Sequence, residues 1–165
     1  MSATDDLLLN NGGYAESFNK GHLSAPPALK LAVVTCMDAR LDTHRLLGIC
    51  EGDAHVIRNA GGIVSDDVIR SLLISQRLLG TREVMVIHHT GCGMATFRDD
   101  DLKDVIEDEM GIRPSFALEA FRELEQDVRQ SMARINASPF IPAKDGIRGF
   151  IYDCATGRLG EVLPG

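Results

Sequence analysis

The chain has 165 residues, of which 44% are hydrophobic and 25% are charged, a composition typical of one globular domain with a sizeable core. Its 24 acidic and 17 basic residues give a formal net charge of −7, and it contains no Lys/Arg-rich run with interleaved aromatic residues, so nucleic acid is not an expected partner. The first residues, MSATDDLLLNNGG, have neither the basic and apolar segments of a leader nor a membrane-spanning apolar run, so we expect a cytoplasmic protein with no membrane segment.

The first part of the chain differs in character from the rest. Residues 1–27 lack a strong hydrophobic period and end near SAPPALK, where two prolines favour an extended backbone leading into the first strand. We interpret residues 1–27 as an N-terminal arm that packs on another surface, such as a second subunit. Residues 28–165 are then expected to form a single α/β domain.

Short, continuous apolar segments rich in Val and Ile predict strands that are buried on both faces, as in a parallel sheet. These segments are LKLAVVTC (29–36), AHVIRNAG (54–61), EVMVIHH (83–89) and IRGFIYDCATGRLGEV (147–162). The last of them contains a turn signal at Thr156-Gly157, which predicts a closing hairpin.

Helical patterns lie between these segments. Residues 65–80 begin with a possible Ser cap and two aspartates and end at a glycine, and residues 99–111 and 118–135 also have helical spacing. In the last of these, one apolar stripe is formed by Leu118, Phe121, Leu124, Val128 and Met132. Strands that alternate with helices predict a three-layer α/β fold: a mostly parallel sheet with helices on both faces and a binding crevice at the carboxyl ends of the strands.

Chemically reactive side chains follow two of the predicted strands. The first strand ends at Cys36, and the third ends at His89, three residues before Cys92. Two thiolates and one imidazole are a recurrent set of catalytic zinc ligands, which leaves the fourth position for water or substrate. Asp38 and Arg40 follow Cys36 at alternate positions, so they share its side of an extended chain and lie just beyond the metal.

Other interpretations of these residues remain open from spacing alone. In a reducing compartment, the thiols of Cys36, Cys50, Cys92 and Cys154 can also be core residues, and a Cys36–Cys92 disulfide is disfavoured but chemically possible. A closed structural zinc site would need a fourth ligand, for which Cys50 and Cys154 show no spacing.

The remaining histidines are treated separately. His88 should face the opposite side of the strand from His89, so at most one of the two is expected to be a metal ligand. The other three, His22, His44 and His55, have no spacing relation to the site, and surface or core roles are expected for them.

Three motifs in this order resemble the β-class carbonic anhydrases over about residues 30 to 160: CMDAR at 36–40, RNAGG at 58–62 and HTGCG at 89–93. The resemblance implies that Cys36, His89 and Cys92 bind Zn²⁺ and that Asp38 and Arg40 form the catalytic pair beside the fourth position. It also implies a parallel sheet extended by an antiparallel C-terminal strand, and a homodimer or dimer of dimers with clefts at the interface.

The activity implied by this resemblance is that of a carbonate dehydratase, in which a zinc-bound hydroxide reversibly hydrates carbon dioxide to bicarbonate and a proton. The glycines of RNAGG leave backbone groups accessible, so we expect this segment to line the substrate cleft, with a simple tight turn as the alternative. Its residues are Arg58, Asn59, Ala60, Gly61 and Gly62. A carbonyl sulfide or carbon disulfide hydrolase of the same family and a non-catalytic zinc protein remain alternative functions.

Overall fold

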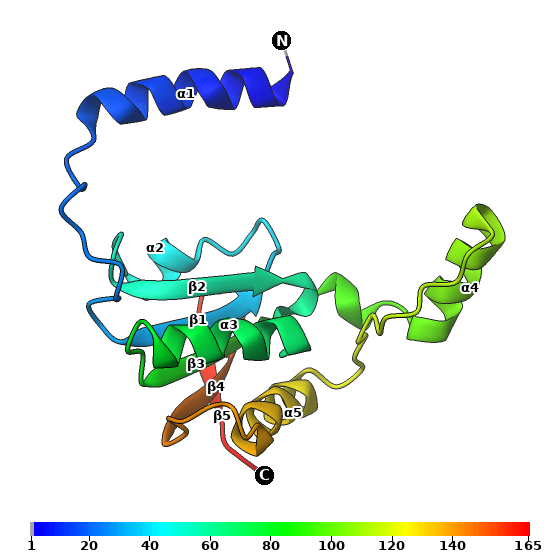
Figure 1. Cartoon of the computed structure of the whole chain (residues 1–165). Helices are drawn as coiled ribbons and strands as arrows, with labels where there is room; N and C mark the ends of the chain where they lie inside the picture. The colour runs from blue at the N-terminus through cyan, green and yellow to red at the C-terminus, as the bar shows by residue number, and fades with distance from the viewer. Residues whose placement is uncertain (1) are drawn as a thin grey trace.

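The computed structural model describes residues 2–165, and within them it places one five-stranded sheet in the order β2-β1-β3-β4-β5 (Figure 1). The strands are β1 (Leu31–Cys36), β2 (Ala54–Asn59), β3 (Glu83–His89), β4 (Gly146–Tyr152) and β5 (Leu159–Val162). Strands β1 to β4 run parallel to one another, and β5 pairs antiparallel with β4 after the turn at Thr156-Gly157. The predicted mostly parallel sheet with an antiparallel C-terminal strand is therefore confirmed.

Helices cover the two faces of the sheet unequally. The helices are α1 (Ala3–Ser17), α2 (Thr43–Leu47), α3 (Asp66–Arg77), α4 (Asp99–Met110) and α5 (Leu124–Ala137). Helices α3 and α5 share one apolar core with alternate residues of β1 and β3, whereas the short α2 contributes Leu47 to a smaller cluster around Val33 and Ile87. Helix α5 packs directly on β4 at Gly149, where the absence of a side chain allows the close approach: a Cβ there would lie 2.4 Å from Val128.

The strand order fixes where a site can form. From β1 the chain moves outward to β2, and it then crosses over β1 to β3 on the other side. The carboxyl ends of β1 and β3 are therefore adjacent at the point where the direction of winding reverses, which is where open α/β sheets bind their ligands. Cys36 is the last residue of β1, and His89 is the last residue of β3.

The prediction of one helix over residues 118–135 is wrong in its first part. Helix α5 begins only at Leu124, because Glu119 has a φ of +61°, in the left-handed region, which interrupts a right-handed helix. The backbone N–H groups of residues 118–120 donate instead to the carboxylate of Asp99. Phe121 still faces the core, but from this irregular segment. The bonds to Asp99 close the base of an arm formed by residues 99–120, which we call the α4 arm.

Two parts of the molecule project from the body, helix α1 and the α4 arm (Figure 1). Among the described residues, neither α1 nor α4 has a buried side chain. Tyr14 of α1 and Lys20, in the segment after it, both bind Glu51 of the body. Helix α1 was not predicted from the sequence. Its three consecutive leucines and paired glycines have no helical period, and its capping box joins Ser2 to Asp5.

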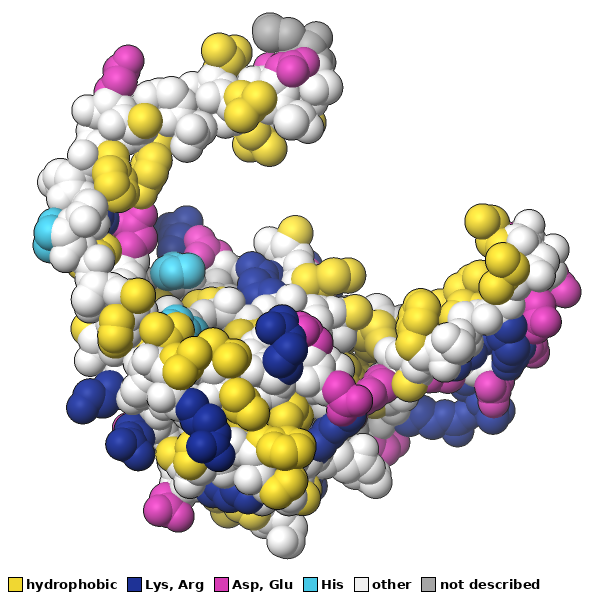
Figure 2. Space-filling view, viewed as in Figure 1, with side chains coloured by type: hydrophobic (Ala, Val, Ile, Leu, Met, Phe, Trp, Pro, Cys, Tyr) yellow, Lys and Arg dark blue, Asp and Glu magenta, His cyan; other side chains and the backbone are white. Residues whose placement is uncertain are grey.

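Apolar side chains are exposed along both projections, as the space-filling view shows (Figure 2). On α1, Leu7, Leu8 and Leu9 are 66%, 67% and 67% exposed. The α4 arm exposes Val105, Met110, Ile112 and Phe116. Across residues 2–165, no helix combines the length and the apolar character that crossing a bilayer requires.

Candidate metal centre and active site

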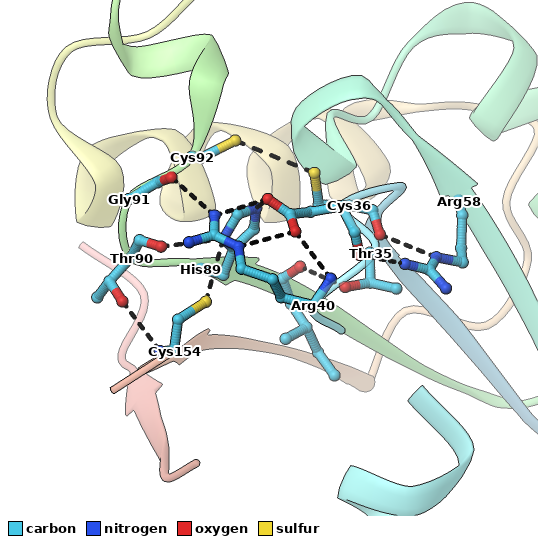
Figure 3. A network of polar contacts seen from close by, with 11 residues as sticks. Thr35, Cys36, Arg40, Arg58, His89, Thr90, Gly91, Cys92 and Cys154 are labelled. Atoms are coloured by element: carbon cyan, nitrogen blue, oxygen red, sulfur yellow. Dashed lines mark hydrogen bonds and ion pairs between the residues drawn. The ribbon is translucent and has the colours of Figure 1, made fainter. Parts of the chain in front are cut away.

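Cys36, His89 and Cys92 come together at the carboxyl ends of β1 and β3 (Figure 3). The three side chains are buried, and their ligand atoms all lie within 4.8 Å of one another. The two Sγ atoms are 4.0 Å apart, close to the roughly 3.8 Å that separates two thiolates bonded to one tetrahedral zinc at about 2.3 Å. The spacing and the donor types thus fit a zinc ion bound between them.

The imidazole of His89 is prepared to bind a cation. Its Nδ1 lies 3.0 Å from the carbonyl oxygen of Thr90, and since a carbonyl can only accept, Nδ1 carries the ring proton. The other nitrogen, Nε2, therefore presents a lone pair, and it is buried without a hydrogen-bond partner among residues 2–165. A buried acceptor that faces two thiols needs a partner, and a metal ion between these three groups would supply one.

The alternative interpretations of the thiols can now be compared with the geometry. Cys36 and Cys92 are free, so the disulfide does not form in this structure. Cys50 is exposed on the surface. Cys154 lies 3.5 Å from Nδ1 of His89, the ring nitrogen opposite to the one that faces the two thiols, so it does not complete a closed four-ligand set.

Asp38 and Arg40 form a two-pronged ion pair beside the cluster. Arg40 Nε donates to Asp38 Oδ1 at 3.0 Å and Nη2 donates to Oδ2 at 2.7 Å, while the backbone N–H of Arg40 also binds Oδ1 at 2.9 Å. These bonds from Arg40 hold the pKa of the Asp38 carboxyl well below its usual range. The carboxylate is therefore charged at neutral pH, and its Oδ2 lies 3.8 Å from Nε2 of His89.

Arg40 is itself held in place from the other side of the site. Its Nη2 also donates to the carbonyl oxygen of Gly91 at 2.9 Å, in the loop that joins His89 to Cys92 (Figure 3). The guanidinium thus ties the segment after β1 to the segment after β3. This contact was not predicted, because a backbone carbonyl leaves no signal in a sequence.

The RNAGG segment divides between two roles. Ala60 and Gly61 line a hollow together with Cys36, Met37, Asp38, Cys92, Gly93 and Met94. Arg58 instead donates to the backbone carbonyls of Cys36 and Asp38, and the side chain of Asn59 donates to that of Ile63. Figure 3 shows the Arg58 guanidinium beside the end of β1 and turned away from the two sulfurs.

Two further residues support the site without having been predicted. The hydroxyl of Thr90 accepts the backbone N–H of Cys154 at 3.0 Å, which joins the end of β3 to the turn after β4. The only sequence signal for Cys154 is its position two residues after β4, and it becomes informative only when β4 is known to lie next to β3.

His22 and His44 are exposed and His55 binds Ser75, so the structure places all three outside the cluster, as predicted.

Known proteins resemble this chain over nearly its full length. A family profile described as "Carbonic anhydrase" matches residues 31–159. Beta-carbonic anhydrase 1 of Mycobacterium tuberculosis is 58% identical over 164 residues, which cover 99% of this chain and 100% of that protein. Carbon disulfide hydrolase of Acidithiobacillus thiooxidans is 33% identical, covering 96% of this chain and 90% of that protein. The solved structure of carbonic anhydrase from Streptococcus mutans matches with a TM-score of 0.93 and 41% identity, covering 99% of each chain.

Proposed function

The chain belongs to the β-carbonic anhydrase family, and on that premise we propose that Cys36, His89 and Cys92 hold one zinc ion per chain. The activity of the protein is that of a carbonate dehydratase, the reversible hydration of carbon dioxide to bicarbonate and a proton. The observation that carries the zinc proposal is the buried Nε2 of His89, which faces two buried thiols and has no other partner among the described residues.

A zinc ion at these ligands would act as a Lewis acid that lowers the pKa of water, which makes hydroxide available near neutral pH. The chain supplies the surroundings for this chemistry. Asp38 is charged, accepts hydrogen bonds only and lies beside the ligands, so it can accept a hydrogen bond from a reacting water and orient it. Arg40 holds that carboxylate through two parallel bonds, which fix its direction as well as its charge.

The hollow beside the ligands suits a small and uncharged substrate. Its walls are mainly apolar, with Met37, Ala60, Gly61 and Met94 among the lining residues, and Asp38 also lines it. Carbon dioxide is linear and carries no net charge, so it can enter such a space without a paired ionic group. The product is an anion, and the guanidinium of Arg40 is a cation nearby that can favour its formation.

Carbon disulfide hydrolysis remains a second candidate, since relatives with that name match this chain. They are 33% and 36% identical, against 58% for the carbonic anhydrase relative, and the hollow itself does not distinguish the two linear substrates. A non-catalytic zinc protein would have no need of the charged Asp38–Arg40 pair beside the ligands.

Stopped-flow measurement with a pH indicator separates these functions. We expect the zinc-loaded protein to release protons from carbon dioxide at a kcat/KM of roughly 10⁴ M⁻¹s⁻¹ or more, and to lose this activity when a chelator removes the zinc. Sulfide release from carbon disulfide under the same conditions is expected to be slower. Faster sulfide release would favour the hydrolase, and no turnover of either substrate would favour the non-catalytic alternative.

We further propose that the protein is a homodimer, or a dimer of such dimers, and that helix α1 packs on the partner subunit. The exposed apolar side chains of α1 and of the α4 arm support this, since monomeric proteins rarely expose such contiguous apolar surface.

The free thiols of Cys36 and Cys92 support a reducing compartment, so we place the protein in the cytoplasm.

The dimer can be tested with charges placed on α1. Changing both Leu7 and Leu8 to Asp should weaken association at least tenfold, because each buried leucine contributes roughly 1.5 to 3 kcal/mol. The control changes Asn10 and Asn11 to Asp, which adds the same charge to the same helix without removing apolar surface. Light scattering at micromolar concentration measures the mass, and a monomeric wild type would contradict the proposal.

A further inference from the structure

A buried histidine beside the metal cluster has no place in the chemistry described above. His88 is 0% exposed and precedes the ligand His89, but its ring is directed to the other face of the sheet, toward α5. We propose that His88 is a positioning residue for the reaction: its Nε2–H holds the carbonyl oxygen of Gly62, and Asp127 on α5 holds the ring in the orientation that this requires.

The contacts of the ring define its orientation. Nε2 lies 3.2 Å from the carbonyl oxygen of Gly62, and because a carbonyl only accepts, Nε2 carries the proton. Nδ1 lies 3.2 Å from Oδ2 of Asp127, and neither of these two buried atoms has a hydrogen-bond partner among the described residues. The ring of Phe121 stacks on the imidazole with centroids 5.8 Å apart and planes inclined by 19°. A strand, a loop and a helix thus meet at one imidazole.

Gly62 links this imidazole to the active site. Its φ of +72° lies in the left-handed region, and a Cβ there would lie 2.9 Å from the backbone nitrogen of Cys36. The backbone of Gly62 therefore packs directly against the strand end that carries a proposed zinc ligand. The two residues before it, Ala60 and Gly61, form part of the wall of the hollow. A shift of Gly62 would displace both the ligand strand and the wall.

The second contact of the ring also favours a fixed orientation. Asp127 is 9% exposed, and its burial, with a further contribution from Glu119, raises the pKa of its carboxyl to about 6. Below a pH of about 6 the carboxyl carries a proton that it could donate to Nδ1, and the imidazole would then accept on one side and donate to Gly62 on the other. At neutral pH the carboxyl is mainly ionised, and the hydrogen bond that fixes the ring is the one from Nε2 to Gly62.

The alternative is a histidine that only fills space in the core, and two amide variants distinguish the possibilities. In His88→Gln the amide nitrogen lies close to the former position of Nε2 and can still donate to Gly62. In His88→Asn the shorter side chain places its amide nitrogen near the former Nδ1, so it reaches Asp127 but not Gly62. Gln is close to histidine in size and Asn is one methylene shorter, so a simple packing role predicts faster exchange throughout the surrounding core in His88→Asn. The proposal instead predicts a change centred on residues 60–64.

The experiment measures zinc content, kcat, KM and backbone hydrogen exchange over residues 60–64. We expect His88→Asn to bind zinc but to lose roughly tenfold in kcat, with faster exchange in this segment, because one buried hydrogen bond is lost. His88→Gln should restore most of both. Equal kcat and equal exchange in the Asn and Gln variants would overturn the proposal.

A second pair of variants tests the same chain of contacts without altering β3. Asp127→Asn can still donate to Nδ1 and should exchange like the wild type over residues 60–64, whereas Asp127→Leu should exchange faster there. Identical exchange in these two variants would also overturn the proposal. The inference rests on the proposed function for its kinetic readout alone. A wild type with no hydration activity would refute that function, and hydrogen exchange would still decide whether His88 holds Gly62.

Discussion

Replacing Cys92 with serine will remove the metal and reduce carbon dioxide hydration to the uncatalysed rate. Serine is nearly the same size as cysteine, but its hydroxyl does not ionise near neutral pH and cannot replace a thiolate ligand. Bound zinc should fall from about one per chain to less than about a tenth after dialysis, as measured by elemental analysis. Cys36→Ser should behave in the same way, since its thiol lies 4.0 Å from that of Cys92 in the same cluster.

Two other cysteines provide matched controls for this result. Cys50→Ser should keep both zinc and activity, because Cys50 is exposed and lies outside the cluster. Cys154→Ser should also keep zinc, since Nδ1 of His89 retains the carbonyl oxygen of Thr90 as its acceptor. Full zinc content in both Cys36→Ser and Cys92→Ser would refute the assignment of the ligands.

Replacing Arg40 with alanine should leave zinc bound and lower kcat/KM by roughly 10²-fold, the lower range for the loss of a positioned catalytic proton acceptor. Without the guanidinium, Asp38 loses two side-chain hydrogen bonds and keeps only the one from the backbone N–H of residue 40 to Oδ1, so Oδ2 is no longer held. Its Oδ2 is already only 3.8 Å from Nε2 of His89, so a small rotation would bring the carboxylate onto the metal. An additional oxygen ligand in the zinc-edge absorption spectrum would identify that state.

Three further variants separate charge from geometry. Arg40→Lys keeps the positive charge but not the two parallel bonds, so it should remain impaired. Arg45→Ala is a control that removes a different arginine. Arg45 donates its backbone N–H to Asp42, a bond that alanine keeps, so this variant should be active. Asp38→Ala should bind zinc and turn over slowly without the additional oxygen ligand. Normal activity in Arg40→Ala would contradict the role given to this pair.

The sequence was informative about the site because its reactive side chains follow directly after the apolar segments that form strands. Cys36 and His89 each terminate an apolar run, and parallel strands bring their carboxyl ends to one edge. The pattern alone therefore predicts that the three candidate ligands lie near one another. It could not reveal that β4 lies next to β3, so Cys154 had no visible partner.

The parts of the fold that were missed depend on contacts distant in sequence. Helix α1 has no buried face in one chain, so the apolar period that marks a core helix is absent from it. The apolar stripe over residues 118–135 continues past the true helix start because Phe121 is buried from an irregular segment. In the RNAGG segment, glycine spacing indicated accessible backbone, but the direction of the Arg58 side chain depends on the carbonyls at the end of β1.

The closed base of the α4 arm has a consequence for how this fold tolerates change. Because the carboxylate of Asp99 binds the N–H groups of residues 118–120, the chain leaves the body and returns to it at one point. Helix α4 lies beyond this closure and has no buried side chain among the described residues. Insertions or deletions within residues 101–116 should therefore leave the sheet and the metal ligands intact. Changes in the arm should therefore alter this projecting surface without altering the chemistry at the sheet edge.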